Sequence, residues 1–510
     1  MKLSYLTGIL LSILLSSCDS QKGSEEVGQW DVFEVVLNGP ETGNPYLEVD
    51  LSATFSKGGD QVKVPGFYDG EGVYRIRFSP GTQGKWTYLT ESNAEQLSGR
   101  KGTFKCISPG AENHGPLQIV NTFYFQYADG TPYYAVGTTA YQWTSVKQSI
   151  QEQTLETLEG APFNKIRMCV FPKHYSFGNE TEPWMHPFAS TEEGRDYTHP
   201  QYAFFQNFDL RIAQLKEMNI QADVILFHPY DIWGYCRMGE EMNERYVRYL
   251  IARISAYRNL WWSLANEWDI PGFKEAIDWE GIGGLLQRED PHNRFRGIHN
   301  WYNSEDHFYD HSRPWITHTC TQTSQFYNAI HWREKYQKPL LFDEMRYEGD
   351  ITAGWGNLSG EEMASYFWMA GLSGAYPTHG ETYANHSDST EVRWWGKGGG
   401  LVGESPERIE WFRSYMEQAP VHDMIPEIVS TGDPQNLESN VYALLKEGEY
   451  YMAYVADSGR RIELDLAGTS PYSLEILDTW NMQVLNREKL EAGHFSYETS
   501  SPYTALILHH

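Results

Sequence analysis

The chain has 510 residues, enough for roughly two to four domains and a large hydrophobic core. Its formal net charge of −28 and sequence pI of about 5.0 argue against nucleic acid or an anionic membrane surface as a ligand. The cysteines beyond Cys18 (Cys106, Cys169, Cys236 and Cys320) are widely spaced and form no CxxC pair. They predict buried free thiols, with one disulfide as the alternative, and they do not resemble a zinc site.

The first residues read as a targeting signal. Lys2 gives a short positive region, an apolar run follows from Leu6 to Leu15, and Leu15-Ser16-Ser17-Cys18 closes it. This pattern resembles a bacterial lipoprotein signal over residues 1–18, in which Cys18 is lipidated. The apolar run is shorter than the roughly 20 residues that a membrane span needs. We therefore expect residues 19–28 to be a polar tether, and the protein to be lipid-anchored in the bacterial cell envelope, at the outer membrane or the cell surface.

Residues 29–108 predict a first folded unit. Val32–Leu37, Leu47–Phe55 and Val73–Phe78 alternate with a period of two, and glycine-containing turns separate them. Several short strands at this spacing indicate an antiparallel, Ig-like β-sandwich. No pair of catalytic residues lies within it. We expect a structural role, with sugar binding as the alternative.

From residue 117 to residue 417 short apolar strands alternate with amphipathic segments, which is typical of parallel β/α units. The pattern predicts a (β/α)8 barrel, in which catalytic groups follow the carboxyl ends of the strands. The eight expected strands are Tyr133–Thr138, Lys165–Phe171, Ala222–Phe227, Leu260–Leu264, Phe295–Ile298, Trp315–Thr319, Pro339–Phe342 and Leu372–Tyr376. Residues 424–510 return to short alternating strands and predict a C-terminal β-sandwich with a stabilising role.

Two of the barrel strands end in carboxylates. Asn266-Glu267 follows the fourth expected strand, and Glu344 follows the seventh. Two carboxylates at the same end of a barrel are what glycosidic bond cleavage requires, one as an acid and one opposite it. Asp343 is a rival to Glu344, although neighbours on a strand point in opposite directions, so only one of the two should face the site.

These positions resemble the retaining glycoside hydrolases built on (β/α)8 barrels. More narrowly, Gly130-Thr131-Pro132-Tyr133-Tyr134 and Gly137–Trp143 are similar to apiosidase-like barrels, which often follow an Ig-like domain. The resemblance implies Glu267 as acid/base and Glu344 as nucleophile. It further implies a carbohydrate substrate, an arginine (Arg167) that braces the nucleophile, and substrate contacts from His228 and His318. A structural ion pair is the alternative for Arg167, and a packed structural histidine is the alternative for each of the other two. No cofactor and no metal are expected.

Other residues near the predicted strand ends complete the expected site. We assign substrate binding also to Asn266, Trp143, Trp268, His379, Glu381 and Trp395. Burial among Trp261, Trp262 and Trp268 should raise the pKa of Glu267. Members of this clan often carry a sugar-stacking Trp on the eighth strand. This chain has Tyr376–Tyr383 there, so Trp394 or Trp395 is expected to take that place, and Glu381 adds a third carboxylate.

Two other functions stay open at this point. A non-catalytic glycan-binding lipoprotein could keep the same barrel, although the intact Glu267 and Glu344 argue against it. A hydrolase or lyase of another kind is the second alternative, but the chain has no Gly-x-Ser-x-Gly motif and no recognisable metal cluster. The sequence specifies neither the sugar and its linkage nor the oligomeric state.

The lipoprotein hypothesis predicts the location of a single variant. Cys18→Ser should move the protein from the membrane pellet to the soluble envelope fraction, because the lipid would no longer be attached. Fractionation after a high-salt wash measures this. A Cys18→Ser protein that stays with the membrane would show that the anchor is not at Cys18.

Overall fold

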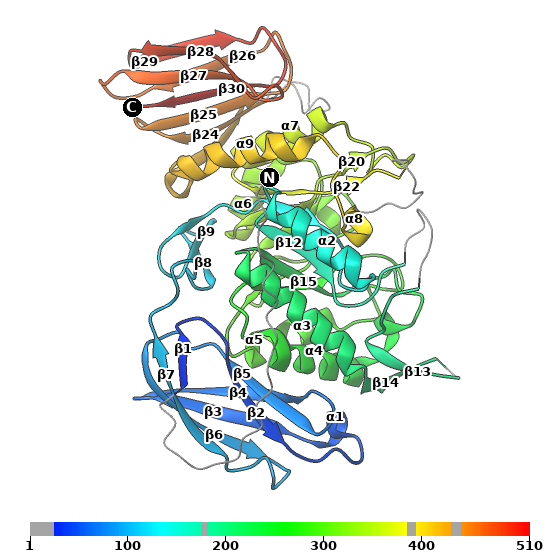
Figure 1. Cartoon of the computed structure of the whole chain (residues 1–510). Coiled ribbons are helices and arrows are strands. Elements are labelled where there is room, and N and C mark those ends of the chain that lie inside the picture. The colour runs from blue at the N-terminus through cyan, green and yellow to red at the C-terminus, as the bar shows by residue number, and fades with distance from the viewer. Residues whose placement is uncertain (1–24, 175–181, 193, 385–393, 430–439) are drawn as a thin grey trace, which may run out of the picture.

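The computed structural model describes residues 25–174, 182–192, 194–384, 394–429 and 440–510. Figure 1 shows a β-domain at each end of the molecule and a larger barrel domain between them. Residues 1–18, with Cys18, lie outside the described residues. Within the described ranges, none of the helices is long and apolar enough to cross a bilayer. Cys106, Cys169, Cys236 and Cys320 are buried free thiols, which confirms that prediction.

The N-terminal domain is a sheet folded over on itself into a sandwich. Strand β4 pairs with β3 along its first part and with β5 beyond Gly66, so it belongs to both halves. Phe33 stacks on Phe104 across the two halves, and Phe55 stacks on Phe78, at centroid distances of 3.9 and 4.4 Å. The elements are β1 Glu25–Gly28, β2 Phe33–Asn38, α1 Pro45–Glu48, β3 Leu51–Lys57, β4 Asp60–Tyr68, β5 Val73–Phe78, β6 Gly84–Ser92 and β7 Lys101–Ile107.

The central domain is an eight-stranded parallel barrel. Its strands follow the order β17-β16-β15-β12-β11-β21-β19-β18, and the backbone N–H of Thr317, two residues before β18, donates to the Arg296 carbonyl of β17. The barrel strands are β11 Gly137–Thr139, β12 Lys165–Cys169, β15 Gln221–Phe227, β16 Leu260–Ala265, β17 Phe295–Gly297, β18 Thr319–Gln322, β19 Leu340–Glu344 and β21 Tyr376–His379.

Three expected strands differ from the structure. The sixth begins at Thr319 instead of Trp315, so His318 precedes it. The eighth begins at Tyr376 instead of Leu372, because helix α7 continues to Leu372. The first is confined to Gly137–Thr139, and Pro132–Tyr133 belongs to a separate small sheet. Short apolar runs are compatible with the end of a helix as well as with a strand, so periodicity did not place these ends.

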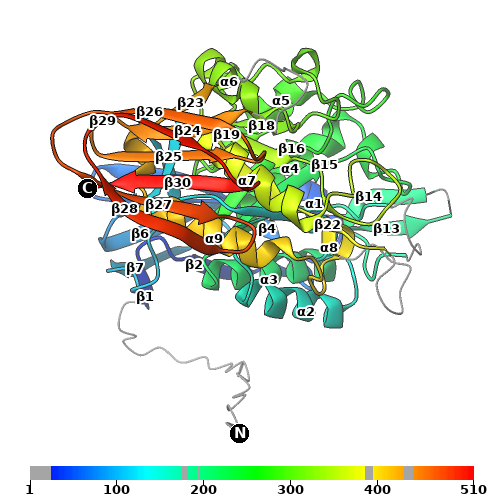
Figure 2. The ribbon, with the colours of Figure 1, turned by 90° about the horizontal axis from the view of Figure 1, so that it is seen from above.

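Helices surround the barrel (Figures 1 and 2). The α-helices are α2 Gln148–Glu159, α3 Tyr202–Glu217, α4 Glu240–Ile254, α5 Trp279–Glu289, α6 Ala329–Tyr336, α7 Gly360–Leu372, α8 Trp394–Lys397 and α9 Ser405–Gln418. Short 3-10 helices are η1 Tyr235–Arg237, η2 Glu305–His307, η3 Phe326–Asn328 and η4 Val421–Asp423. Small strands outside the barrel are β8 Leu117–Val120, β9 Tyr124–Tyr127, β10 Pro132–Tyr133, β13 Phe188–Thr191, β14 Gly194–Pro200, β20 Glu348–Gly349 and β22 Glu381–Thr382.

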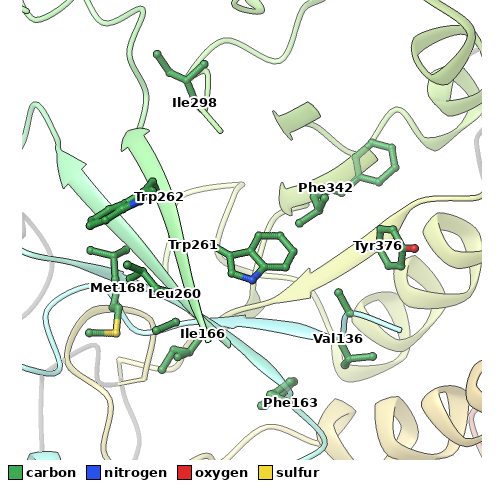
Figure 3. Close-up of a cluster of buried hydrophobic side chains, with 14 of the residues drawn as sticks. Val136, Phe163, Ile166, Met168, Leu260, Trp261, Trp262, Ile298, Phe342 and Tyr376 are labelled. Atoms are coloured by element: carbon green, nitrogen blue, oxygen red, sulfur yellow. The ribbon is translucent and has the colours of Figure 1, made fainter. Parts of the chain in front are cut away.

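Alternation along the strands builds the barrel core. Figure 3 shows Trp261 and Trp262 on opposite sides of β16. The Trp261 ring lies 5.0 Å from that of Phe125, and Trp262 donates its indole N–H outward to Asp290. Phe125, on the β8–β9 hairpin, also packs against Phe295 and Tyr376 and closes the amino-terminal end of the barrel. Packed aromatic side chains therefore fill the barrel interior at its amino-terminal end.

Buried ion pairs join the N-terminal domain to the barrel. The Arg77 guanidinium donates to Asp209 on α3 at 2.8 Å, and Arg253 on α4 pairs with both Asp209 and Asp69 at 2.6 and 2.8 Å. These side chains are nearly inaccessible to water. Removing one partner of such a pair leaves an uncompensated buried charge. The N-terminal domain is consequently part of the packing of the barrel helices.

The C-terminal domain is a second antiparallel sandwich. Its larger sheet has the order β23-β24-β25-β30-β27-β28, and β26 pairs with β29 in the smaller one. Buried apolar side chains such as Ile462, Leu464, Leu474 and Leu508 fill the space between the two sheets. The strands are β23 Ile425–Val429, β24 Val441–Lys446, β25 Tyr450–Val455, β26 Arg461–Leu466, β27 Tyr472–Asp478, β28 Gln483–Leu490, β29 Gly493–Glu498 and β30 Thr504–His509. The observed fold class is the predicted one: two β-sandwich domains flanking a (β/α)8 barrel.

Candidate active site

A cavity of about 700 Å³ opens at the carboxyl ends of the barrel strands. Its walls come from segments that follow several different strands, and both Glu267 and Glu344 line it. Its other wall residues include Lys173, Tyr230, Trp301, Gln322, Tyr347, Trp355 and Trp395. The aromatic share of this lining suits the faces of sugar rings. Of the residues assigned to substrate binding, Trp395 is among these wall residues.

Glu267 follows β16 in a strained conformation. Its φ of +59° lies in the left-handed region, which a residue with a Cβ rarely adopts. The carboxyl is 5% exposed, and burial raises its pKa above the ordinary value. Lys173, the Tyr230 hydroxyl and Gln322 oppose this effect, while Asp269 adds to it. Among the described residues, Glu267 Oε2 has no hydrogen-bond partner. It is therefore open to a ligand.

The expected cause of this shift was wrong in detail. Trp261 packs at the amino-terminal end of the barrel, and Trp262 points out toward Asp290. Trp268 lies half-buried against Tyr309, with the Lys274 ammonium 4.8 Å from its ring. The aromatic residues that do line the cavity with Glu267 include Tyr230, Tyr347, Trp355 and Trp395. They come from loops after other strands.

Glu344 is the last residue of β19 and is 7% exposed. The Tyr141 hydroxyl donates to its Oε1, and His299 Nε2 lies 3.5 Å from the same oxygen. Burial raises the pKa of Glu344 to about 8, and a hydrogen bond from Tyr347 opposes the shift. Burial thus raises the pKa of both Glu267 and Glu344 and favours the protonated form of each carboxyl group.

Gln322 connects the two carboxyl groups. In the amide orientation that satisfies both ends of this side chain, its nitrogen donates to Glu267 Oε1 at 3.0 Å and lies 3.0 Å from His299 Nε2. His299 in turn lies beside Glu344. Turned over, the same amide would place its oxygen against the carbonyl oxygen of Asn300, which cannot donate a hydrogen bond. The Gln322 nitrogen is therefore the group that faces Glu267, where it favours the ionised carboxylate.

The two ends of the Asn266 side-chain amide differ in their hydrogen bonds. Its Oδ1 accepts from Arg167 at 3.2 Å and lies 3.0 Å from the Tyr141 hydroxyl. Its Nδ2 is buried and has no partner among the described residues. A buried N–H donor without a partner favours binding of an acceptor from a ligand. Asn266 is fully buried and is not among the cavity walls, so its assignment to substrate binding stays a prediction.

Arg167 does not brace Glu344 as expected. Its guanidinium pairs with Asp343 at 2.6 Å, and Lys165 bonds the same carboxylate at 3.0 Å and Asp223 at 2.6 Å. Although burial acts to raise it, these two cations hold the pKa of Asp343 well below its usual range. Asp343 is inaccessible to water. The strand alternation thus separates Asp343 from the cavity and leaves Glu344 there.

Three predicted histidine contacts lie in packed surroundings. His228 donates from Nε2 to the Phe171 carbonyl at 3.1 Å. The ring of His318 packs against Trp261 at the amino-terminal end of the barrel, because the strand that it was thought to close begins only after it. The ring of His379 stacks on Phe163 and its Nδ1 contacts Thr138. All three are almost fully buried, and burial lowers the pKa of each imidazole.

The remaining two residues assigned to substrate binding, Trp143 and Glu381, also lie in the packed interior. Trp143 is fully buried in the barrel core. Both oxygens of Glu381 accept backbone N–H groups, from Val402 and Gly403, at 2.8 and 2.9 Å. Burial raises the pKa of Glu381 to about 7. Neither residue is among the walls of the cavity.

One group of potential metal ligands occurs in the described part of the chain. Atoms of Glu348, His379 and Glu381 lie within 4.8 Å of one another, all buried. Glu348 accepts hydrogen bonds from the backbone N–H groups of Glu404 and Ser405 at the start of α9. Since the backbone already supplies donors to both carboxylates, the group is explained as an anchor for α9. It lies outside the cavity walls.

Sequence reasoning missed several residues of the site. Tyr141 was noted only as part of a motif, and Lys173, Tyr230, His299, Gln322 and Tyr347 were not considered. Except for Gln322, each follows a barrel strand by a few positions. Gln322 is the last residue of β18, so a correct placement of that strand would have pointed to it. A position at or just after the end of a strand, and not the residue type, was therefore the feature that could have identified these site residues.

Comparison with known proteins decides the family. Residues 120–412, more than half of the chain, match the apiosidase-like catalytic domain. The chain belongs to the apiosidase-like family. Residues 26–93, in front of the apiosidase-like barrel, match a domain of unknown function, DUF5060.

Solved structures agree with this assignment. The apiosidase-like chain is 34% identical to a putative glycoside hydrolase from Bacteroides vulgatus ATCC 8482, over 95% of this chain and 100% of that one, with a TM-score of 0.84. A glycoside hydrolase family 5 protein from the same organism is 16% identical over 78% of this chain and 93% of that one (TM-score 0.60), which shows a shared fold alone. No curated protein matches the chain. The family and its structural relatives support hydrolysis of glycosides and a carbohydrate substrate.

The contact between Tyr141 and Glu344 generates a prediction. Tyr141→Phe should lower kcat/KM for a glycoside about 10- to 100-fold, because a hydrogen bond to a charged group contributes about 1.5–3 kcal/mol. Losing that donor disfavours the ionised carboxylate, so the acidic limb of the pH profile should move to higher pH. Tyr309→Phe is a matched control, since its hydroxyl donates to Glu280 outside the cavity. Identical pH profiles for both variants would contradict the assignment.

Proposed function

We propose that this apiosidase-like protein hydrolyses an O-glycosidic bond of an oligo- or polysaccharide by a retaining double displacement. Glu267 is the acid/base and Glu344 the nucleophile. The observation that carries the proposal is that Glu267 and Glu344, at the carboxyl ends of β16 and β19, line one cavity while Asp343 and Glu381 are engaged elsewhere. A retaining mechanism further requires carboxyl groups about 5–5.5 Å apart.

The surroundings of Glu344 support its role as nucleophile. Tyr141 and Tyr347 direct hydroxyl groups at this carboxylate and favour its ionised form. In the first half of the reaction Glu344 attacks the anomeric carbon, and the bond to the leaving oxygen breaks. Its fixed orientation at the end of a strand reduces the entropy that this attack would otherwise lose.

The surroundings of Glu267 support its role as acid and base. Its Oε2 is available to a ligand, and it can give its proton to the leaving oxygen. In the second half, Glu267 takes a proton from water, whose oxygen attacks the anomeric carbon and displaces Glu344. The Gln322 amide donates a hydrogen bond to Glu267 Oε1, which favours the ionised form that acts as the base.

Asn266 and the aromatic walls supply the binding groups. Asn266 precedes Glu267 and its buried Nδ2 has no partner among the described residues, so we assign it the hydroxyl beside the reacting carbon, a contact that strengthens in the transition state. Trp301 and Trp395 offer faces to sugar rings. We also propose that the enzyme acts from a lipid anchor at Cys18 in the cell envelope. A non-catalytic glycan-binding protein remains the alternative, and turnover of aryl glycosides distinguishes the two.

The role of Glu267 predicts a dependence on the leaving group. Glu267→Gln should abolish turnover of glycosides with poor leaving groups, while the glycosylation step of activated aryl glycosides should change little, since a good leaving group needs no proton. The burst of released phenol in a stopped-flow experiment measures that step. An equal loss on both kinds of substrate would remove Glu267 from this role.

The role of Glu344 predicts a covalent adduct. A slow-turnover fluorinated glycoside should label Glu344, which mass spectrometry of the tryptic peptide detects. Glu344→Ala should be inactive, and azide should restore turnover by entering the vacated space, giving the inverted glycosyl azide. A label on Asp343 or Glu381 would overturn the site. An inverted product from the wild-type enzyme would overturn the mechanism, because it implies carboxyl groups about 6.5–9.5 Å apart.

A further inference from the structure

Lys173 presents an ammonium group inside the cavity. It follows β12, is 4% exposed, and lines the same cavity as Glu267. Its Nζ lies 3.7 Å from the ring centroid of Tyr141, 4.4 Å from that of Tyr230 and 5.3 Å from that of Trp395. Aromatic faces attract a cation and limit its movement. The charge is therefore held at one place in the wall.

The groups that face this ammonium come from several strands. Glu267 attracts it from the end of β16, the thiol of Cys169 lies on β12 itself, and Arg167 repels it. His228 and His299 also lie within its field, and burial keeps both imidazoles neutral near pH 7. Of these groups, Glu267 is the one whose charge changes during a double displacement.

The charge on Lys173 acts on Glu267 against burial. Desolvation favours the protonated carboxyl, and Lys173 makes the largest contribution in the opposite direction, ahead of Tyr230 and Gln322. Burial also lowers the pKa of Lys173, to about 8, so the ammonium is charged at and below neutral pH. Without a nearby cation, a carboxyl in this position would hold its proton too firmly to act as a base.

We propose that Lys173 is a positioning residue for Glu267: its caged charge allows Glu267 to work as a base in the second half of the reaction after serving as an acid in the first. The proposal rests on the proposed function. In the second half, the water proton passes to Glu267, the water oxygen bonds to the anomeric carbon, and the electron pair of the breaking bond returns to Glu344. Only an ionised Glu267 can accept that proton.

Two features of the site agree with this role. The rings around Nζ belong to residues of the same machinery: the Tyr141 hydroxyl contacts Glu344, and that of Tyr230 favours ionised Glu267. The Gln322 amide nitrogen donates to Glu267 Oε1 at 3.0 Å and also favours its ionised form. Lys173 supplies the charge in this arrangement, and Gln322 supplies a hydrogen-bond donor.

The test compares Lys173→Met and Lys173→Gln with Lys173→Arg and with Lys57→Met. Lys57 is a matched control, because its ammonium lies over the Trp86 ring in the N-terminal domain. Without the charge, the basic limb of kcat/KM should move up by about one pH unit, since that limb reports the acid form of Glu267. The Lys173→Arg variant should stay close to the wild-type enzyme.

A second measurement separates the two half-reactions. With an activated aryl glycoside, kcat of Lys173→Met near neutral pH should fall about 10-fold, because deglycosylation needs the base. Azide should restore it, because this anion attacks the glycosyl-enzyme without giving up a proton, and the product should be the glycosyl azide of retained configuration. The Lys57→Met variant should show neither effect.

The outcomes distinguish this proposal from the function on which it rests. If Lys173→Met and Lys173→Gln keep the wild-type basic limb and gain nothing from azide, Lys173 has no role in positioning the proton. The same conclusion follows if Lys173→Arg shifts the limb as far as Lys173→Met does. Should Lys173→Met fail to fold, Lys173→Gln decides. If instead Glu267→Gln loses activity equally on both kinds of leaving group, it is the assignment of Glu267 that fails.

Discussion

Four ionised side chains lie together in the barrel, almost inaccessible to water: Lys165, Asp223, Asp343 and Arg167. Lys165 bonds both aspartates, and Arg167 bonds Asp343 at 2.6 Å. Buried charges of this kind are stable only when they are paired with opposite charges, since the loss of one partner leaves the other uncompensated. Each side chain is thereby fixed to one position. The arrangement at the carboxyl ends of the neighbouring strands depends on this cluster.

Hydrogen bonds connect this cluster of buried charges to the residues near the cavity. Arg167 uses one nitrogen for Asp343 and another for Asn266 Oδ1, which directs the Asn266 Nδ2 away from the cluster. The Tyr141 hydroxyl lies between Asn266 and Glu344. Because Asp343 is bound within the cluster, alternation along β19 turns Glu344 to the opposite side. One set of buried charges therefore orients both the Asn266 amide and the Glu344 carboxyl group.

The sequence contained most of the architecture and only part of the site. Alternating β/α segments indicated the barrel, and strand-end carboxylates indicated Glu267 and Glu344, because both signals are local. The ion-pair partner of Arg167 could not be read from the local sequence, because it depends on which of the two carboxylates, Asp343 or Glu344, turns toward Arg167. His318 was misplaced because its strand begins one residue later. Lys173 and His299 were missed because a loop residue gains its role from neighbours that are distant in sequence.

The hairpin that closes the amino-terminal end of the barrel affects how molecules can enter and leave it. Phe125 packs against Trp261, Phe295 and Tyr376, so that end offers no passage to the reacting centre. The cavity that Glu267 and Glu344 line opens at the opposite end. In the proposed double displacement, the water of the second step would then arrive from the side on which the first product departs. Both exchanges would use one opening, and a product that still fills this opening would keep water away from the covalent intermediate.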